Sequence, residues 1–324
     1  MENESLKLLE PPPPERLSGW LREIYGKQVI VRQRQLLRHR DLSLVERLSL
    51  DDAMPASLIY KVVLPPWDIE QDLHERILIP EVSSSARLYL SGTYQRTTAL
   101  FLEDLGPVSL LDRQDDNIAC QLGTELAKLH RAFTYRISEV RDQTILRTLT
   151  PSKYEEITAQ MCSYLGAENL ANTADLQLLN QLGALLGAVL ASEPVSLVHG
   201  DLYAENILLN SGKLFIIDWS WFTTIGAPIM DLATVTMAHP KNGGFETKRA
   251  EVIEAYCTEY SRPSDEVYAR LPFAEALSRL LFLQWLLERR QRGIMGTTVG
   301  PVDGVIAKIV AELLATLKNL SSSS

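Results

Sequence analysis

Residues 197–221 of the chain read LVHGDLYAENILLNSGKLFIIDWSW. Two short apolar runs, at 207–209 and 214–217, are separated by the turn-forming residues NSGK, and this pattern predicts a β-hairpin. An antiparallel pair brings the residue before its first strand close to the residue after its second strand. We therefore expect Asn206 and Asp218 to lie side by side at one end of the hairpin.

Three oxygen-bearing side chains converge on this hairpin. Asn206 and Asp218 offer hard oxygen atoms of the kind that bind Mg²⁺, which usually keeps water and phosphate oxygens as its other ligands. Asp201 lies on the segment that leads into the hairpin, from where it could accept a proton from an attacking hydroxyl. Each residue alone could cap a turn or bond to backbone, but the three at this spacing favour a phosphoryl-transfer site.

The motifs HGDLYAENIL, IIDW and GAPIMDLA resemble those of the aminoglycoside phosphotransferase and choline kinase family, whose members have a protein-kinase-like fold. The resemblance runs loosely over residues 61–290 and is strong over 199–233. It implies that Asp201 is the catalytic base and that Asn206 and Asp218 are the Mg²⁺ ligands.

The resemblance also covers two shorter segments. Residues 126–130, LAKLH, look like the end of a helix that such kinases carry early in the larger lobe. LEDL, at residues 102–105, looks like the hinge between the lobes. The backbone of Glu103, Asp104 and Leu105 is therefore expected to bind the purine of the co-substrate, which is ATP or GTP.

Length and composition agree with a soluble two-lobe protein. The chain has 324 residues, of which 46% are hydrophobic and 23% are charged, and this suits two unequal lobes. Three scattered cysteines suggest neither a disulfide framework nor a zinc site. The net charge of −9 argues against a nucleic-acid partner. Neither a signal peptide nor a membrane span is expected, so we predict a cytoplasmic protein.

Hydrophobic periodicity predicts an α+β fold in two parts. Residues 1–27 are expected to form an N-terminal extension with a short helix at 15–25. An N-lobe at 28–105 is expected to be mainly antiparallel sheet with one helix, at 68–78, and a C-lobe at 106–324 mainly helical. The expected strands are 29–36, 42–48, 57–64, 87–91 and 97–102. The expected C-lobe helices follow an apolar stripe from Ile118 to Leu129 and span 152–165, 174–190, 229–238, 245–260, 272–290 and 305–317.

Lys61 stands in the middle of the third expected strand, just before the helix of the N-lobe. It could be a solvated strand position. Its place instead favours the lysine that grips nucleotide phosphates and is held by a glutamate of the neighbouring helix. Glu75 resembles the family pattern better than Glu70, so we predict Glu75 as the partner and keep Glu70 in reserve.

A glycine-rich phosphate loop is missing, because no glycine lies between Gly26 and Gly92. The expected turn between the first two strands carries Arg38 and Arg40 instead. Guanidinium groups suit phosphate geometry, so either arginine could replace backbone amides as a phosphate contact. The alternative is a basic, solvated hairpin tip without a ligand.

The acceptor is expected to be a small molecule. Only twelve residues separate Asp218 from Asp231, too few for the activation segment on which protein kinases bind a peptide. Asp231 is expected to cap a helix and support the catalytic loop, and His199 to be a packed support. Glu275 and Glu288 are candidate carboxylates for a cationic amine, and Trp285 for a cation-π contact. Solvated helix faces and core packing are the alternatives for these three.

Together these patterns predict an ATP- and Mg²⁺-dependent kinase of a small hydroxyl compound, either aminoglycoside-like or an amino-alcohol. Two alternatives remain. A non-catalytic nucleotide-binding module is favoured by the missing glycine loop, and a protein kinase is disfavoured by the short segment after Asp218.

Overall fold

The computed structural model describes residues 9–78, 84–294, 296–297 and 300–322 and divides into two compact units. Unit 1 comprises the described residues of Met1–Ser109 together with Asn206–Trp221, and unit 2 comprises those of Leu110–Glu205 and Phe222–Ser324. The expected C-lobe was one continuous span, whereas the hairpin segment 206–221 groups with unit 1. The reason is packing, since Leu208 and Phe215 of the hairpin contact the core cluster of Leu100 and Leu102.

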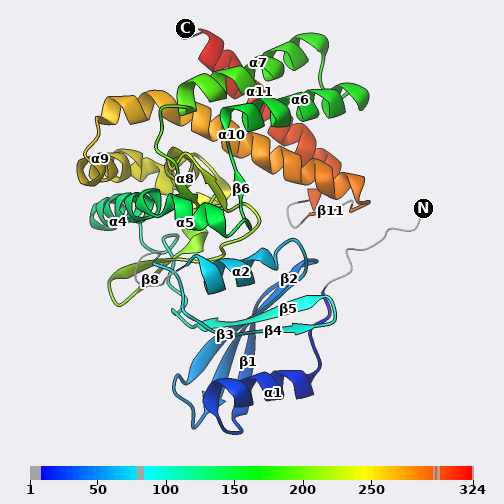
Figure 1. Cartoon of the computed structure of the whole chain (residues 1–324), viewed down its shortest axis with the longest axis vertical. Helices are drawn as coiled ribbons and strands as arrows, with labels where there is room; N and C mark the ends of the chain where they lie inside the picture. The colour runs from blue at the N-terminus through cyan, green and yellow to red at the C-terminus, as the bar shows by residue number, and fades with distance from the viewer. Residues whose placement is uncertain (1–8, 79–83, 295, 298–299, 323–324) are drawn as a thin grey trace. The chain divides into compact units, whose positions relative to one another are not determined.

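Unit 1 is built on an antiparallel sheet with the strand order β1-β2-β3-β5-β4 (Figure 1). The five predicted strands are confirmed, with ends that differ by up to three residues: β1 (Ile30–His39), β2 (Ser43–Asp51), β3 (Ser57–Val63), β4 (Leu88–Tyr94) and β5 (Thr97–Glu103). Two predicted helices are also confirmed, α1 (Pro14–Tyr25) and α2 (Ile69–Arg76). A second hairpin is formed by β8 (Ile207–Asn210) and β9 (Lys213–Ile216).

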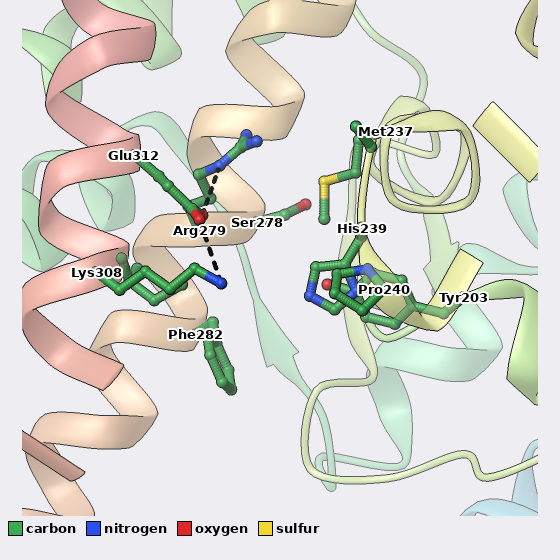
Figure 2. A pocket seen from close by; sticks show the side chains of 11 residues that line it. Tyr203, Met237, His239, Pro240, Ser278, Arg279, Phe282, Lys308 and Glu312 are labelled. Atoms are coloured by element: carbon green, nitrogen blue, oxygen red, sulfur yellow. Dashed lines mark ion pairs between the residues drawn. The ribbon is translucent and has the colours of Figure 1, made fainter. Parts of the chain in front are cut away.

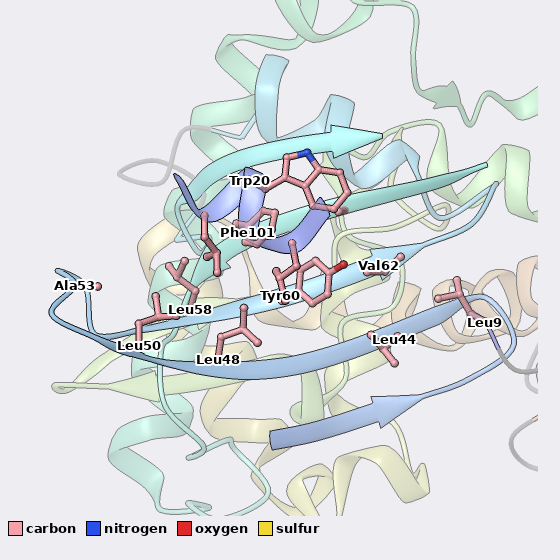
Figure 3. Packing of buried hydrophobic residues seen from close by; sticks show 13 residues of the cluster. Leu9, Trp20, Leu44, Leu48, Leu50, Ala53, Leu58, Tyr60, Val62 and Phe101 are labelled. Carbon is pink, nitrogen blue, oxygen red and sulfur yellow. The ribbon is translucent and has the colours of Figure 1, made fainter. Parts of the chain in front are cut away.

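Alternation along the central strands gives the sheet two buried faces. On β3, Leu58, Tyr60 and Val62 point into one core, which also holds Trp20 of α1 and Phe101 of β5 (Figure 3). Residues between them in sequence point to the opposite face because strand side chains alternate with period two. That opposite face is where Lys61 lies.

Gly92 on β4 shows how closely α1 packs on the sheet. A Cβ atom at this position would lie 2.3 Å from the indole nitrogen of Trp20. Any larger residue would therefore push α1 away from the core.

Unit 2 is mainly helical (Figure 1). Its described helices are α4 (Asp116–Tyr135), α5 (Ile137–Asp142), α6 (Pro151–Ala167), α7 (Thr173–Leu190), α8 (Ile229–Thr236), α9 (Arg249–Tyr260), α10 (Ser264–Gln291) and α11 (Val302–Ser322). Short elements complete it: the sheet β6 (Arg147–Thr148), β10 (Thr224–Gly226) and β7 (Ser196–Val198), the pair β11 (Gly296–Thr297) and β12 (Gly300–Pro301), and the 3₁₀ turns η2 (Pro240–Asn242) and η3 (Phe245–Lys248). A further turn, η1 (Ala204–Asn206), precedes β8.

Two predicted helices begin at least four residues away from the predicted start. The helix expected to begin at Pro272 begins eight residues earlier and continues through the proline. Pro272 lacks the N–H that would close one helical hydrogen bond, but Val267, Leu271 and Ala274 on either side are fully buried, so packing outweighs that loss. The helix expected from Phe245 starts instead as the 3₁₀ turn η3 and becomes α-helical at Arg249.

The described cysteines are free, and their burial differs. Cys257 is buried, Cys162 is half-buried and Cys120 is exposed. Across the same described residues, none of the helices has both the length and the apolar character that crossing a membrane requires.

Helices α4 and α9 of unit 2 lie close together at Gly123. A Cβ atom there would lie 2.2 Å from the carbonyl oxygen of Val252, which is backbone and cannot rotate away. We expect Gly123→Ala to lower the free energy of unfolding by about 2–3 kcal/mol. In the same unit, Gly304→Ala is the control, because nothing lies within 4 Å of its Cβ position. Chemical denaturation measures both, and equal stability of the two variants would contradict the packing argument.

Candidate active site

Unit 1 holds a buried cluster of charges around Lys61. Its Nζ atom lies 2.5 Å from Oδ1 of Asp218 and 2.5 Å from Oε2 of Glu70, and the Lys61 and Glu70 side chains are 5% and 2% exposed. Burial opposes the charge of the ammonium group, but the two carboxylates outweigh this and raise the pKa of Lys61. The lysine therefore stays charged and fixed in position.

The predicted pairing of Lys61 with Glu75 is wrong, because the partner is Glu70. Residues Glu70, Leu73 and Ile77 form the buried face of α2 and its end. Glu75 lies off this face, where Ser91 and Gln71 donate hydrogen bonds to Oε1 at 2.5 and 3.0 Å. Periodicity favoured neither glutamate, and the resemblance that selected Glu75 pointed to the wrong one.

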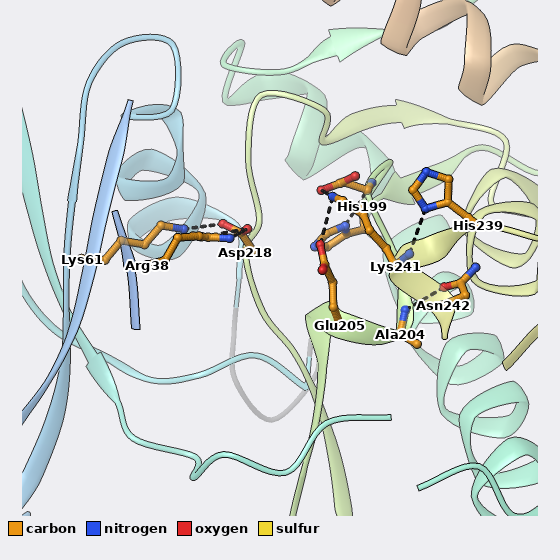
Figure 4. Close-up of polar contacts among 10 residues, drawn as sticks. Arg38, Lys61, His199, Ala204, Glu205, Asp218, His239, Lys241 and Asn242 are labelled. Atoms are coloured by element: carbon orange, nitrogen blue, oxygen red, sulfur yellow. Dashed lines mark hydrogen bonds and ion pairs between the residues drawn. The ribbon is translucent and has the colours of Figure 1, made fainter. Parts of the chain in front are cut away.

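Arg38 completes the cluster. Its two terminal nitrogens each lie 3.1 Å from Oδ2 of Asp218 (Figure 4). A β-bulge between Leu36 and Arg38 interrupts the register of β1 with β2. Such a bulge shifts the alternation of side chains by one and so re-aims the next one. Arg40 lies at the turn after β1, where its N–H donates to the carbonyl of Ser43 at 2.7 Å.

Asp218 stays ionised in this setting. Burial alone would raise its pKa, but Arg38 and Lys61 together hold the pKa of Asp218 well below its ordinary value. The stabilisation that this carboxylate contributes is thus present above its unfolded pKa of about 4. It is lost only as the pH falls from there through the lower folded pKa.

The hairpin places Asn206 and Asp218 at one end, as predicted. Ile207 pairs with Ile216, and the N–H of Ile217 donates to the carbonyl of Asn206 at 2.9 Å. Asn206 is buried, and Asp218 has the left-handed φ of 63°, which aspartate tolerates better than most residues. Within the described residues, no cluster of three His, Cys, Asp or Glu side chains could hold a metal ion. A cation at this pair would therefore take its other ligands from water or phosphate.

The side chains of the expected hinge make hydrogen bonds and packing contacts within unit 1. Asp104 accepts hydrogen bonds from Arg47 Nε at 2.8 Å and from the N–H of Gly106 at 3.0 Å. Glu103 accepts from the N–H of Arg87 at 3.3 Å, and Leu105 is buried in the core. A ligand at this segment would therefore have to be bound by its backbone.

In unit 2, Asp231 supports the loop that carries Asp201. Its carboxylate is fully buried and accepts hydrogen bonds from the N–H groups of His199 and Gly200, both at 2.9 Å. Its Oδ2 atom also lies 3.2 Å from Nε2 of the buried His130. Support of the loop by Asp231 was expected, whereas a helix cap was not found: the Asp231 side chain bonds to the loop and not to the N-terminus of α8.

Close packing at Gly200 and a hydrogen bond of His199 also fix this loop. Gly200 has a φ of 77°, and a Cβ atom there would lie 2.3 Å from the carbonyl oxygen of Phe222, so only glycine fits. His199 is fully buried, and its Nδ1 accepts a hydrogen bond from the N–H of Asp201 at 3.2 Å. Asp231 thus holds the backbone just before Asp201, and His199 holds the N–H of Asp201 itself.

Lys241 is a site residue that the sequence did not reveal. Its Nζ atom lies 3.0 Å from Oε1 of Glu205 (Figure 4). The same atom lies 3.5 Å from Oδ2 of Asp201 and 4.8 Å from the centre of the Tyr203 ring. The lysine stands 40 residues after Asp201, in the turn-forming run HPKNGG. Nothing in local spacing connects such a turn to the loop that carries Asp201.

Asn242 holds this turn against the loop. Its side-chain oxygen accepts from the N–H of Ala204 at 2.9 Å, and its side-chain nitrogen donates to the carbonyls of Thr234 and Met237, each at 2.9 Å. All these bonds are buried, so Lys241 is presented on a rigid backbone.

The three residues predicted to bind an acceptor make other contacts within unit 2. Glu275 is paired with Arg249 at 2.8 Å. Trp285 packs on Phe282 and under the guanidinium of Arg289, 4.9 Å from its ring centre. Glu288 is half-buried, burial raises its pKa, and it lines a separate cavity between α6 and α10.

Comparison with protein families identifies the chain. The model of the phosphotransferase enzyme family matches residues 71–274, which is more than half of the chain. A comparison with curated protein sequences gives no match.

Several solved structures share the fold. A choline/ethanolamine kinase family protein from Mesorhizobium loti is 14% identical, with a TM-score of 0.63 over 94% of this chain and 94% of that one. Plasmodium vivax ethanolamine kinase is 11% identical, with a TM-score of 0.59 over 90% and 82%. A thermostable mutant of an aminoglycoside phosphotransferase, in a ternary complex with AMP-PNP and hygromycin B, is 13% identical, with a TM-score of 0.60 over 93% and 98%. The predicted protein-kinase-like fold is confirmed.

We expect Asp231→Asn to destabilise unit 2. The amide would turn one acceptor into a donor that faces the N–H groups of the loop, which costs about 2–3 kcal/mol of the free energy of unfolding. Asp303→Asn is the control, because this aspartate is 55% exposed and its ion pair with Arg290 lies at the surface. Urea denaturation compares the two, and an equally small loss in both variants would show that Asp231 does not anchor the loop.

Proposed function

The chain belongs to the phosphotransferase enzyme family, and on this premise we propose that it transfers the γ-phosphoryl group of ATP or GTP, with Mg²⁺, to a hydroxyl group of a small molecule. Asp201 is the catalytic base, Asn206 and Asp218 are the metal ligands, and Lys61 holds the nucleotide phosphates. The purine binds at the backbone of residues 103–105.

The charge cluster of unit 1 is the observation that carries this proposal. In kinases of this fold, a lysine on β3 pairs with a helix glutamate, and an aspartate nearby binds Mg²⁺. Lys61 lies on β3, contacts Glu70 of α2 and also contacts Asp218. A buried lysine that is shared by two carboxylates costs desolvation energy, so a functional reason for the arrangement is favoured over a purely structural one.

The residues present fit a magnesium ion. Asp218 is held in its charged form, and Asn206 adds a neutral amide oxygen beside it. When bound, Mg²⁺ would neutralise charge on the β- and γ-phosphate oxygens. Arg38 occupies Oδ2 of Asp218 in this structure, so the arginine and a metal ion would compete for that oxygen. Arg38 would then be free to contact phosphate.

The transfer itself balances simply. The acceptor oxygen forms a bond to the γ-phosphorus, and the bond between that phosphorus and the β,γ-bridging oxygen breaks. The electron pair leaves on the nucleoside diphosphate, and the acceptor proton moves to the Asp201 carboxylate.

Lys241 serves as a positioning residue for Asp201. Its ammonium group bridges Asp201 and Glu205, which keeps two neighbouring carboxylates from repelling each other. It thereby holds the base in one orientation and lowers the negative charge that an incoming phosphoryl group would meet.

The test of this function is nucleotide turnover with Mg²⁺ across a panel of hydroxyl acceptors. We expect diphosphate release to depend on the acceptor and to fall by about 10²–10⁴-fold in Asp201→Ala, because a general base typically contributes that much. Binding of nucleotide should persist in the variant. Nucleotide binding without acceptor-dependent turnover in the wild type would favour the non-catalytic alternative.

A matched pair of variants tests the assignment of the phosphate-holding lysine. Glu70→Gln removes the charged partner of Lys61, and we expect kcat/KM for the nucleotide to fall by roughly 10- to 100-fold. Glu75 lies on the same helix, and its described hydrogen bonds come from Ser91 and Gln71. Glu75→Gln should therefore leave kcat/KM within about twofold of the wild type. Steady-state kinetics at saturating acceptor measures both values. Similar losses in the two variants would contradict the assignment.

A further inference from the structure

Unit 2 contains a cavity of about 270 Å³ beside the catalytic loop (Figure 2). Helices α10 and α11 form one wall, with Arg279, Lys308 and Glu312. The opposite wall is formed by Tyr203 and His239. Tyr203 stands two residues after Asp201, and its ring lies under Lys241, which contacts Asp201. The cavity therefore adjoins the base that the proposed function requires.

The size of the cavity limits its ligand. Cavities that take drug-sized ligands usually measure about 300–1,000 Å³. At about 270 Å³ this one falls just below that range. It suits a short hydroxylated chain or a single sugar ring better than a molecule of several rings.

Cations outnumber anions on the cavity wall. Glu312 is its one carboxylate among the described residues, and it is already shared by Arg279 and Lys308, each at 3.8 Å (Figure 2). The nearby Glu275 accepts a hydrogen bond from Arg249 at 2.8 Å. An ammonium group entering the cavity would thus find its carboxylates engaged and two cations facing it.

The two cations are only loosely paired. Glu312 lies 3.8 Å from Nε of Arg279, and Glu275 lies 3.8 Å from its Nη1 atom, both beyond hydrogen-bond distance. The Nη1 atom is buried and makes no hydrogen bond. Lys308 is 67% exposed and reaches Glu312 at 3.8 Å. An oxyanion between these groups would supply the short, charge-assisted bonds that the carboxylates do not.

His239 lies in the field of the same cations. Its pKa is lowered to about 4, first by burial and then by the cations around it. These cations are Lys241, Lys308 and Arg279. Nδ1 of the neutral ring accepts from the N–H of Lys241 at 3.2 Å, which leaves Nε2–H as a further donor.

We propose that this cavity binds the acceptor and that the acceptor carries an oxyanion, either a carboxylate or a phosphate, which Arg279 and Lys308 bind while its hydroxyl faces Asp201. This inference rests on the proposed function, because it names the acceptor class of that reaction. It differs from the amine acceptor that the sequence predicted through Glu275, Glu288 and Trp285.

Matched acceptors on one carbon skeleton test the charge preference. Glycerate, glycerol 3-phosphate and 3-amino-1,2-propanediol form one series, and gluconate, glucose 6-phosphate and glucosamine form the second. We expect kcat/KM for one or both anionic members to exceed that for the amine by about tenfold or more, as a charge-assisted contact provides. The better anion identifies the carboxylate or the phosphate as the group that is bound. Preference for the amines would overturn the proposal.

Variants then assign the preference to the cavity. Lys308→Gln and Arg279→Gln should each raise KM for the preferred anion about tenfold, whereas KM for the amine should fall or stay the same because one repelling cation is gone. Lys308 is exposed, so its variant should fold even if Arg279→Gln does not. Lys318→Gln on the same helix is the control, because Lys318 is paired with Asp175 outside the cavity. An unchanged KM in both cavity variants would contradict the assignment.

Binding without turnover separates this proposal from the proposed function. Calorimetric titration of the full chain with the same anions, in the absence of nucleotide, should show binding that weakens about tenfold in Lys308→Gln. If the anions bind in this way but no acceptor is phosphorylated, the kinase reaction is wrong and the oxyanion site stands. If acceptors are phosphorylated in an Asp201-dependent way but the anions neither bind nor react, the oxyanion site is wrong and the kinase reaction stands.

Discussion

The Asp218 carboxylate, shared between Lys61 and Arg38, is the interaction on which unit 1 depends. Each of its oxygens faces one cation, at 2.5 and 3.1 Å, and the lysine in turn holds Glu70. Three separate segments, β1, α2 and the exit of the β8–β9 hairpin, are thereby fixed around β3. The burial of these charges is costly unless each has a partner, so a change to one member affects the positions of all. Such a cluster is well suited to exchange its internal partners for the charges of a phosphate chain and a metal ion.

In unit 2, the loop around Asp201, the proposed base, is held in place while the Asp201 side chain stays partly exposed. Asp231 and His199 fix the backbone around Asp201, while Lys241 steadies its side chain from a turn that Asn242 anchors. The same turn supplies His239 to the cavity, so the proposed base and the proposed acceptor site share one rigid segment. The cations that line this cavity suggest how members of one phosphotransferase fold differ in acceptor. The scaffold is retained, and a few side chains on the late helices set the charge that is accepted.

The sequence predicted those parts of the fold and site that are encoded within a short stretch of residues, and it did not predict those that depend on distant contacts. The hairpin with Asn206 and Asp218 at its ends, the five strands and Lys61 on β3 all follow from periodicity and spacing within short windows. Glu70 was kept only in reserve, because periodicity favoured neither glutamate and the family resemblance favoured Glu75. The direction of the Arg38 side chain depends on a β-bulge in β1. The contacts of Lys241 depend on the loop of Asp201, which lies 40 residues earlier in the chain. The unbroken helix through Pro272 reflects packing that no local propensity contains.

Asp218 is proposed to organise a site for nucleotide phosphate and Mg²⁺. Calorimetric binding of AMP-PNP to the wild type and to Asp218→Asn tests this role most directly. The substitution keeps the shape of the side chain and the tolerance of a left-handed backbone but removes the charge. We predict that the wild type binds the nucleotide more tightly with Mg²⁺ than without it. In Asp218→Asn that dependence should disappear and the affinity should fall by about tenfold or more. Equal affinity and equal Mg²⁺ dependence in the two proteins would contradict the account.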